Sequence, residues 1–293
     1  MISGVYVPLL TAFTGDGAVD PAGFARQAQW LAERGTDGLV PFGSTGEGPS
    51  LSLREKRALL DALVSAVPGV PLLPAITCAS LDDALALVEV INDLPAAGIM
   101  LLPPFYFRPL GDDALRRYAE PVLAASRHPV ILYHIPEFAP PVPVETVAAL
   151  PVWGVKDSGG DLAYTRAVLA TGKGAMVGVE PTIVEAIGAG ASGTIAGLAN
   201  VLPEPLIGAC AAASDGRLAD AHRILAPALA FRDALITAGP PLAWVSVMKR
   251  LAEERHGIAL GGVRAPLPSA AAAAEALLPA LREVLAQLEV ARP

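Results

Sequence analysis

Cysteine, histidine and basic residues are scarce in this chain of 293 residues, and each shortage excludes a class of protein. Two cysteines, Cys78 and Cys210, are too few for a disulfide framework, so we expect a reducing, cytoplasmic location. Lys and Arg number 21 against 29 acidic residues, which gives a net charge of -8. Such an acidic balance argues against nucleic acid and against an anionic membrane surface as partners.

Metal-site and targeting motifs are also missing. The four histidines form no HExxH motif and the cysteines have no ligand spacing, so we expect no metal. The first residues lack a basic segment followed by an apolar one, so we expect no signal peptide. The alanine run at 270–274 is followed by Glu275 and Arg282 at helical spacing, which predicts a surface helix rather than a membrane span.

Short apolar runs are abundant, and each is followed by a longer segment with helical periodicity. Runs of this length without polar alternation are typical of parallel strands that are buried on both faces. Eight such runs lie at residues 5–10, 38–42, 71–76, 98–102, 129–134, 152–156, 175–179 and 193–198.

Eight strand-then-helix units predict an α/β fold, a (β/α)₈ TIM barrel, and no dinucleotide fingerprint follows the first strand. Ser52 and Glu55 have the spacing of a capping box at the start of one of the helices. Beyond about residue 203 only helical patterns follow. We therefore expect a barrel over residues 1–222 and a C-terminal helical segment over 223–293, packed on the barrel.

The sequence Gly-Ser-Thr-Gly-Glu at residues 43–47 follows the second predicted strand. In a TIM barrel, catalytic groups lie at the carboxyl ends of the strands. The glycines permit a tight turn, which can present the amides and hydroxyls of Ser44 and Thr45 to a carboxylate. The alternative is an ordinary strand-to-helix loop in which these two residues act as helix caps.

Lys156 ends the sixth predicted strand, so its side chain is expected to point into the barrel mouth. Burial there disfavours the ammonium form, and the neutral amine is a nucleophile toward carbonyls. The alternative is a lysine that simply pairs with Asp157.

Two tyrosines are further candidates. Tyr133 ends the fifth predicted strand, where a phenol can move protons to and from a substrate oxygen, although a core tyrosine is the alternative. Tyr106 lies in a proline-rich aromatic loop after the fourth strand, which could instead be a packing or subunit-contact loop. His134 should point away from Tyr133 and is expected either to be structural or to support a neighbouring site residue.

Taken together, these motifs resemble the dihydrodipicolinate synthase / N-acetylneuraminate lyase family of class I, pyruvate-dependent aldolases. The resemblance runs from residues 8–13 to 263–267. It implies that Lys156 forms the Schiff base, that Tyr133 is the proton shuttle, and that Ser44 links Tyr133 to Tyr106, which reaches into a neighbouring subunit. It also implies that Thr45, with the Ser44 backbone, holds the substrate carboxylate.

The resemblance further implies a homotetramer built as a dimer of dimers, with no cofactor beyond the covalent lysine imine. Its partners would be a small 2-oxo acid and an aldehyde. Backbone positions of the family's site match Gly178 and Ile195.

One position departs from the synthases. They carry an arginine for a second carboxylate where this chain has Phe138, preceded by Glu137. Phe138 cannot pair with a carboxylate, and Glu137 would repel one, although Glu137 could bind the hydroxyls of a polyol and Phe138 could pack on an apolar aldehyde. The segment after the turn at residues 43–47 is more similar to 2-keto-3-deoxy-gluconate aldolases than to the synthases.

The sequence therefore favours a Schiff-base lyase or aldolase, with a 2-keto-3-deoxy sugar acid as a possible substrate. The alternatives are 4-hydroxy-tetrahydrodipicolinate synthase, which joins pyruvate and aspartate semialdehyde, and a non-catalytic 2-oxo-acid sensor on the same barrel. A phosphate-binding barrel isomerase fits less well, because the glycine-rich stretch at 188–193 precedes the eighth strand.

Overall fold

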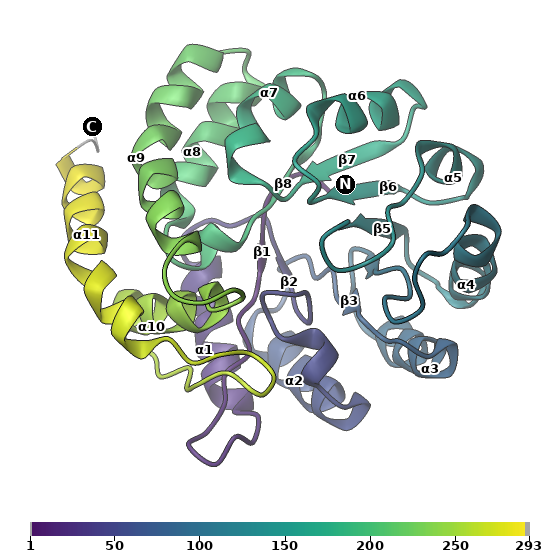
Figure 1. The fold of residues 1–293 in the computed structure, drawn as a ribbon, viewed down its shortest axis with the longest axis horizontal. Coiled ribbons are helices and arrows are strands. Elements are labelled where there is room, and N and C mark those ends of the chain that lie inside the picture. Colours follow the sequence, from purple (N-terminus) through teal and green to yellow (C-terminus); the bar gives the residue numbers. More distant parts are fainter. Residues whose placement is uncertain (1, 291–293) are drawn as a thin grey trace.

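A computed structural model describes residues 2–290, and eight parallel strands form its centre (Figure 1). The sheet order is β2-β1-β8-β7-β6-β5-β4-β3, and an isolated parallel bridge between Leu39 and Leu72 joins its two edges into a nearly closed barrel. The strands are β1 Gly4–Pro8, β2 Gly38–Val40, β3 Ala75–Ile76, β4 Ile99–Leu101, β5 Val130–His134, β6 Gly154–Asp157, β7 Gly174–Val177 and β8 Gly193–Ile195.

Helices surround these strands, so the predicted TIM barrel is confirmed (Figure 1). One α-helix follows each strand: α1 Pro21–Ala32, α2 Leu53–Ala66, α3 Leu81–Asn92, α4 Asp112–Ala125, α5 Val144–Ala149, α6 Leu162–Ala170, α7 Ile183–Gly188 and α8 Pro203–Ser214. Three short 3₁₀ turns lie in the loops: η1 Gly48–Ser50, η2 Glu180–Thr182 and η3 Gly197–Asn200. Three further helices end the described chain: α9 Leu218–Ile236, α10 Trp244–His256 and α11 Ala271–Val290.

Local sequence explains where several elements begin and end. The capping box predicted for α2 is present, because the Glu55 amide donates to Ser52 Oγ and the Ser52 amide donates to Glu55 Oε2. The third strand is shorter than its apolar run, since β3 holds only residues 75–76 of the expected 71–76. Pro71 and Pro74 have no amide hydrogen to donate to a ladder, which shortens the strand.

The two faces of the strands build two separate apolar clusters. On β5, Leu132 packs outward among the helices, whereas Ile131 and Tyr133 belong to the cluster inside the barrel. The ring of Tyr6 fills this interior next to Gly38, where an added Cβ would lie 2.2 Å from the ring. Tyr133 therefore lies on the inner face of the barrel, at the carboxyl end of its strand.

The C-terminal helices pack on one side of the barrel, where α10 lies against α11 and α9 against α8 (Figure 1). The expected division at residue 222 falls within α9, and residues 1 and 291–293 of the expected segments lie outside the described residues. Glu204 of α8 forms ion pairs with Arg255 of α10 at 2.6 Å and with Arg34 at 3.6 Å. Across residues 2–290, no helix combines the length and the apolar character needed to cross a membrane.

Candidate active site

A cavity of about 460 Å³ opens at the carboxyl ends of β2, β5, β6, β7 and β8. This is the end of a TIM barrel at which catalytic groups gather. All but one of the predicted site residues line it: Ser44, Thr45, Tyr133, Glu137, Phe138, Lys156, Gly178 and Ile195. The exception is Tyr106.

Lys156 of β6 points into this cavity from a strand position paired with Tyr133 of β5. Its side chain is 5% exposed, and Nζ lies 4.1 Å from the centre of the Tyr133 ring. No carboxylate among residues 2–290 forms an ion pair with it. Asp157 faces the other way and accepts hydrogen bonds from Thr165 Oγ1 and the Gly159 amide, so the alternative of a Lys156–Asp157 pair is wrong.

Gly178, just after β7, leaves room for the lysine. A Cβ added there would lie 2.9 Å from Lys156 Cε and 2.3 Å from Ser158 Oγ. Any side chain at this position would therefore displace the amine. Ser158 lines the same cavity, and sequence reasoning did not single it out although it directly follows the strand of Lys156.

The turn after β2 has a constrained backbone. Phe42 and Glu47, at its two ends, both have positive φ angles of 68° and 55°. Non-glycine residues adopt this region at a cost, and such strain is concentrated at functional sites. Within the described chain, the amides of Ser44 and Thr45 donate to no protein acceptor, so both are available to a ligand.

The two predicted tyrosines differ in position. Tyr133 is 2% exposed, and its hydroxyl lies 3.4 Å from Ser44 Oγ, which begins the predicted hydroxyl relay. Tyr106 is 79% exposed on the surface of the single chain and lies outside the cavity. Phe107 beside it is 70% exposed.

The cavity also contains residues that the sequence did not reveal. Glu180, buried in η2, accepts hydrogen bonds from Arg232 Nε at 3.0 Å and from the Leu198 amide at 3.2 Å. Trp244 and Met248 of α10 also line the cavity. Glu180 follows β7, so the strand-end rule could have indicated it, whereas nothing in a helical pattern shows that α9 and α10 reach the barrel mouth.

The dihydrodipicolinate synthetase family model matches residues 1–283. The chain belongs to this family. A 4-hydroxy-tetrahydrodipicolinate synthase 1 from Streptomyces coelicolor is 34% identical over 272 residues, which cover 89% of this chain and 87% of that protein. The predicted family is thus confirmed, and with it a Schiff-base-forming lyase or aldolase.

Solved structures agree on the fold of this family member. KD(P)GA from T. tenax is 27% identical with a TM-score of 0.86 and covers 97% of this chain and 99% of its own. A Sulfolobus 2-keto-3-deoxygluconate aldolase, in complex with D-KDPG, is 25% identical with a TM-score of 0.88 and covers 97% of each chain. A Ruminococcus gnavus sialic acid aldolase, 20% identical over 97% of this chain and 98% of its own, superposes with a TM-score of 0.91 and shows the shared fold.

His134 has a structural role in this dihydrodipicolinate synthetase family member. Its Nδ1 accepts a hydrogen bond from the Val142 amide, and its ring stacks on Tyr164 with the centroids 4.0 Å apart. Burial lowers the pKa of the imidazole, which fits a neutral ring in a packed position. No group of three or more His, Cys, Asp and Glu residues within 2–290 could hold a metal ion.

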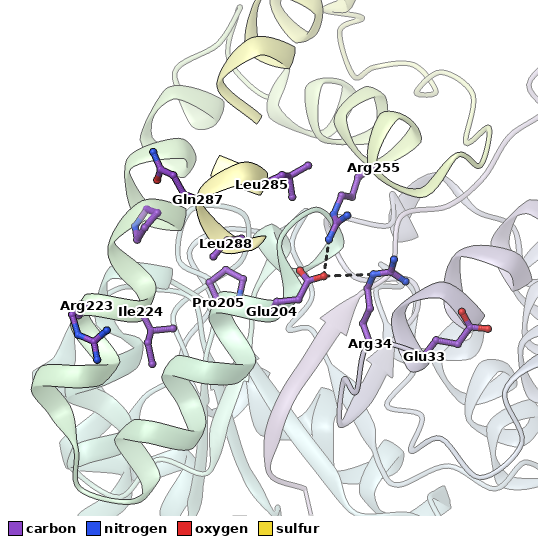
Figure 2. Close-up of a pocket in the computed structure, with 11 residues that line it drawn as sticks. Glu33, Arg34, Glu204, Pro205, Arg223, Ile224, Arg255, Leu285, Gln287 and Leu288 are labelled. Carbon is purple, nitrogen blue, oxygen red and sulfur yellow. Dashed lines mark hydrogen bonds and ion pairs between the residues drawn. The ribbon is translucent and has the colours of Figure 1, made fainter. Parts of the chain in front are cut away.

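A second cavity, of about 630 Å³, lies where α8, α9, α10 and α11 meet the end of α1 (Figure 2). Figure 2 shows Glu204 between Arg34 and Arg255, so these three charged groups are engaged with one another. The residues that line it include none of the predicted site residues and no group from a strand end. The smaller cavity around Lys156 is therefore the candidate active site.

Proposed function

We propose that Lys156 forms a Schiff base with C2 of pyruvate or of a longer 2-oxo acid, and that the chain cleaves or forms a carbon–carbon bond to an aldehyde. The observation that carries this proposal is a buried amine without a carboxylate partner, 4.1 Å from the Tyr133 ring centre. It shares one cavity with the Ser44 and Thr45 amides. We propose a 2-keto-3-deoxy sugar acid as the substrate.

The chemistry requires an electron sink, which the lysine provides. The neutral Lys156 amine attacks C2, and loss of water leaves a protonated imine. When the C4 hydroxyl loses its proton, the C3–C4 bond breaks, an aldehyde leaves, and the bonding electrons move into the imine to give an enamine. Protonation of C3 and hydrolysis then release pyruvate and restore the amine.

Tyr133 is the proposed proton carrier for the C4 hydroxyl. Its own hydroxyl lies at the cavity and within 3.4 Å of Ser44 Oγ, so a proton can pass along this pair. A positioned acid–base group contributes roughly 10²–10⁴-fold to a rate. The larger part of the acceleration is therefore assigned to the covalent lysine intermediate.

The turn at Ser44 and Thr45 is the proposed carboxylate site. Backbone amides that converge on one point bind an anion without a cation. Binding there orients C2 toward Lys156, a contribution of orientation rather than of chemistry. Ile195 and Gly178 line the same cavity.

The lining of the cavity fits a polyol chain. Ser158, Glu137 and Glu180 line it and offer oxygens to hydroxyl groups, while Phe138 provides an apolar surface. Glu180 is already held by Arg232, which fixes its carboxylate in place. This mixture of acceptors supports a sugar acid better than a small apolar aldehyde.

A second candidate activity is that of a 4-hydroxy-tetrahydrodipicolinate synthase, which the 34% identity to a protein of that name favours. The second carboxylate of aspartate semialdehyde needs a cation. Phe138 offers none, but Arg232 lines the same cavity and could serve. A non-catalytic 2-oxo-acid sensor is the third candidate, in which the imine forms but no bond is broken.

We further propose a homotetramer in the cytoplasm, with Tyr106 contributing to a neighbouring subunit's site. Tyr106 and Phe107 form an exposed aromatic pair, which is a surface suited to another copy of the chain. Cys78 and Cys210 are both free, as a reducing compartment favours. Light scattering after gel filtration measures the mass, and a monomer would contradict this assembly.

Borohydride trapping tests the function. Reduction in the presence of pyruvate should add one pyruvate to Lys156, as located by peptide mass spectrometry. The enzyme is then assayed with 2-keto-3-deoxy sugar acids, N-acetylneuraminate, 4-hydroxy-2-oxoglutarate, and aspartate semialdehyde plus pyruvate. Turnover of a sugar acid supports the proposal, synthesis from the semialdehyde supports the second candidate, and an adduct without any turnover supports the sensor. An adduct on a different residue rejects the mechanism.

A further inference from the structure

A buried ion pair lies directly behind the carboxylate-binding turn. Nζ of Lys249, on α10, is 2.7 Å from Oε1 of Glu47, and the two side chains are 1% and 0% exposed. Lys249 Nζ also donates to the Gly262 carbonyl at 2.6 Å. The last residue of the turn is thus held by a cation from a helix about 200 positions further along the chain.

The second oxygen of Glu47 is held by the same part of the chain. The Arg264 amide donates to Glu47 Oε2 at 2.8 Å. The Arg264 guanidinium continues to Glu55 on α2 and to the Ser50 carbonyl, so it binds the segment that follows the turn. Each oxygen of the Glu47 carboxylate therefore has a partner from beyond residue 240.

The backbone of Glu47 connects these contacts to the ligand-facing amides. Glu47 has a left-handed backbone, with φ 55° and ψ 32°, which a residue with a side chain adopts at a cost. Its amide donates to the Ser44 carbonyl at 3.1 Å and closes the turn. The turn is also held by the Gly46 and Gly48 amides on the Gly43 carbonyl and by Thr11 Oγ1 on the Gly46 carbonyl. If Glu47 were released, the peptide groups of Ser44 and Thr45 would lose the contact that ties them to the C-terminal part of the chain.

Helix α10 reaches the substrate cavity as well as the pair. Met248, the neighbour of Lys249, lines that cavity, and its Cε would lie 3.3 Å from a Cβ added at Gly197. A Cβ at Gly197 would also lie 3.6 Å from Thr45 Oγ1. The helix, the turn and the wall of the cavity are thus packed against one another.

We propose that the Glu47–Lys249 pair is a positioning device, which holds the Ser44–Thr45 amides in the orientation that binds the 2-oxo acid carboxylate. This inference rests on the proposed function of the same turn. Neither residue touches the substrate. Their main effect is on affinity for the acid, because the nucleophile lies on β6 and is not held by the pair, and the proton carrier Tyr133 meets the turn only through the Ser44 hydroxyl.

The test is a mutant cycle read by borohydride trapping at increasing pyruvate concentrations. In Lys249→Met the half-saturating pyruvate concentration should rise about tenfold or more, since small misplacements of binding groups have effects of this size. The maximal amount of adduct on Lys156 should stay close to that of the parent protein. Steady-state KM should rise in the same way, with kcat changed far less.

A lone Lys249→Met change leaves a buried carboxylate without its cation, which can prevent folding. The double variant Glu47→Gln/Lys249→Met contains no buried charge and keeps the shape of both side chains. The half-saturating pyruvate concentration of the double variant should rise by about the same factor as that of each single variant. It should not rise by the product of the two single factors, because residues that act as a pair are not additive.

Lys56 is the matched control, since it is a buried lysine of α2 whose Nζ contacts Cys78 Sγ and not the turn. Lys56→Met should leave the half-saturating pyruvate concentration within about twofold of that of the parent protein. Unchanged half-saturation in the folded double variant, or an equal rise in Lys56→Met, would overturn the positioning role. If the parent protein itself forms no adduct on Lys156, it is the proposed function that fails.

Discussion

The barrel strands and the C-terminal helices build the two ends of one cavity by different physical means. At the proposed pyruvate site, Lys156 lies over the Tyr133 ring and forms no ion pair within residues 2–290. The C-terminal helices instead attach through paired charges, with Lys249 on Glu47 and Arg255 on Glu204. A reactive amine has to stay unpaired, whereas a structural cation in a buried position has to be paired. In the proposed mechanism, two lysines of similar burial therefore serve opposite purposes.

The largest expected effect tests the strand side of this comparison. Lys156→Ala should abolish nearly all turnover of any substrate, because no other group in the cavity can act as the covalent electron sink. Steady-state pyruvate release with a sensitive coupled assay measures it. The double variant Glu47→Gln/Lys249→Met is the contrast, in which kcat should survive and KM should rise. A Lys156→Ala protein with parental rates would end the proposed mechanism.

A smaller loss is expected at Tyr133. Tyr133→Phe keeps the ring under the Lys156 amine but removes the hydroxyl, so kcat should fall by roughly 10²–10⁴-fold. Borohydride trapping by pyruvate should remain, since imine formation does not need the C4 proton carrier. Loss of trapping together with turnover would show that the hydroxyl is required for imine formation too.

The sequence predicted the strand side of the site and little of the other side. Lys156, Tyr133 and the turn at Ser44 follow from one rule, that polar residues which end buried parallel strands gather at one rim. Strand ends were less certain, since prolines shortened β3. The pairing of Glu47 with Lys249 depends on how the C-terminal helices fold back, which their periodicity does not specify.

Substrate selection tests the helical side. Trp244 of α10 lines the cavity, and Trp244→Ala should lower kcat/KM for the proposed sugar acid by at least about 10–200-fold, the range for a single lost methylene. The half-saturating pyruvate concentration in trapping should change far less, because the groups proposed to bind pyruvate lie on the turn and on the strand ends. An equal loss for pyruvate and for the sugar acid would mean that the two ends of the cavity are not independent.

The smallest effect concerns how firmly α10 is attached, and it depends on pH. Burial lowers the pKa of His256 to about 4, and its Nε2 lies 2.6 Å from the Asn200 carbonyl oxygen. Between pH 6.5 and 4 the unfolded chain binds a proton at His256 that the folded chain does not. The contribution of the neutral His256 ring to the free energy of unfolding is therefore complete above pH 6.5 and is lost as the pH falls toward 4. The loss is at most about 3 kcal/mol, and less to the extent that the ring is hydrated. Urea unfolding at pH 7.5 and at pH 5 gives the change in the free energy of unfolding between these pH values, and this change should be smaller for His256→Gln than for the parent protein. An equal change in both proteins would assign the acid sensitivity to other groups. Turnover at pH 7.5 is the control and should be the same in both proteins.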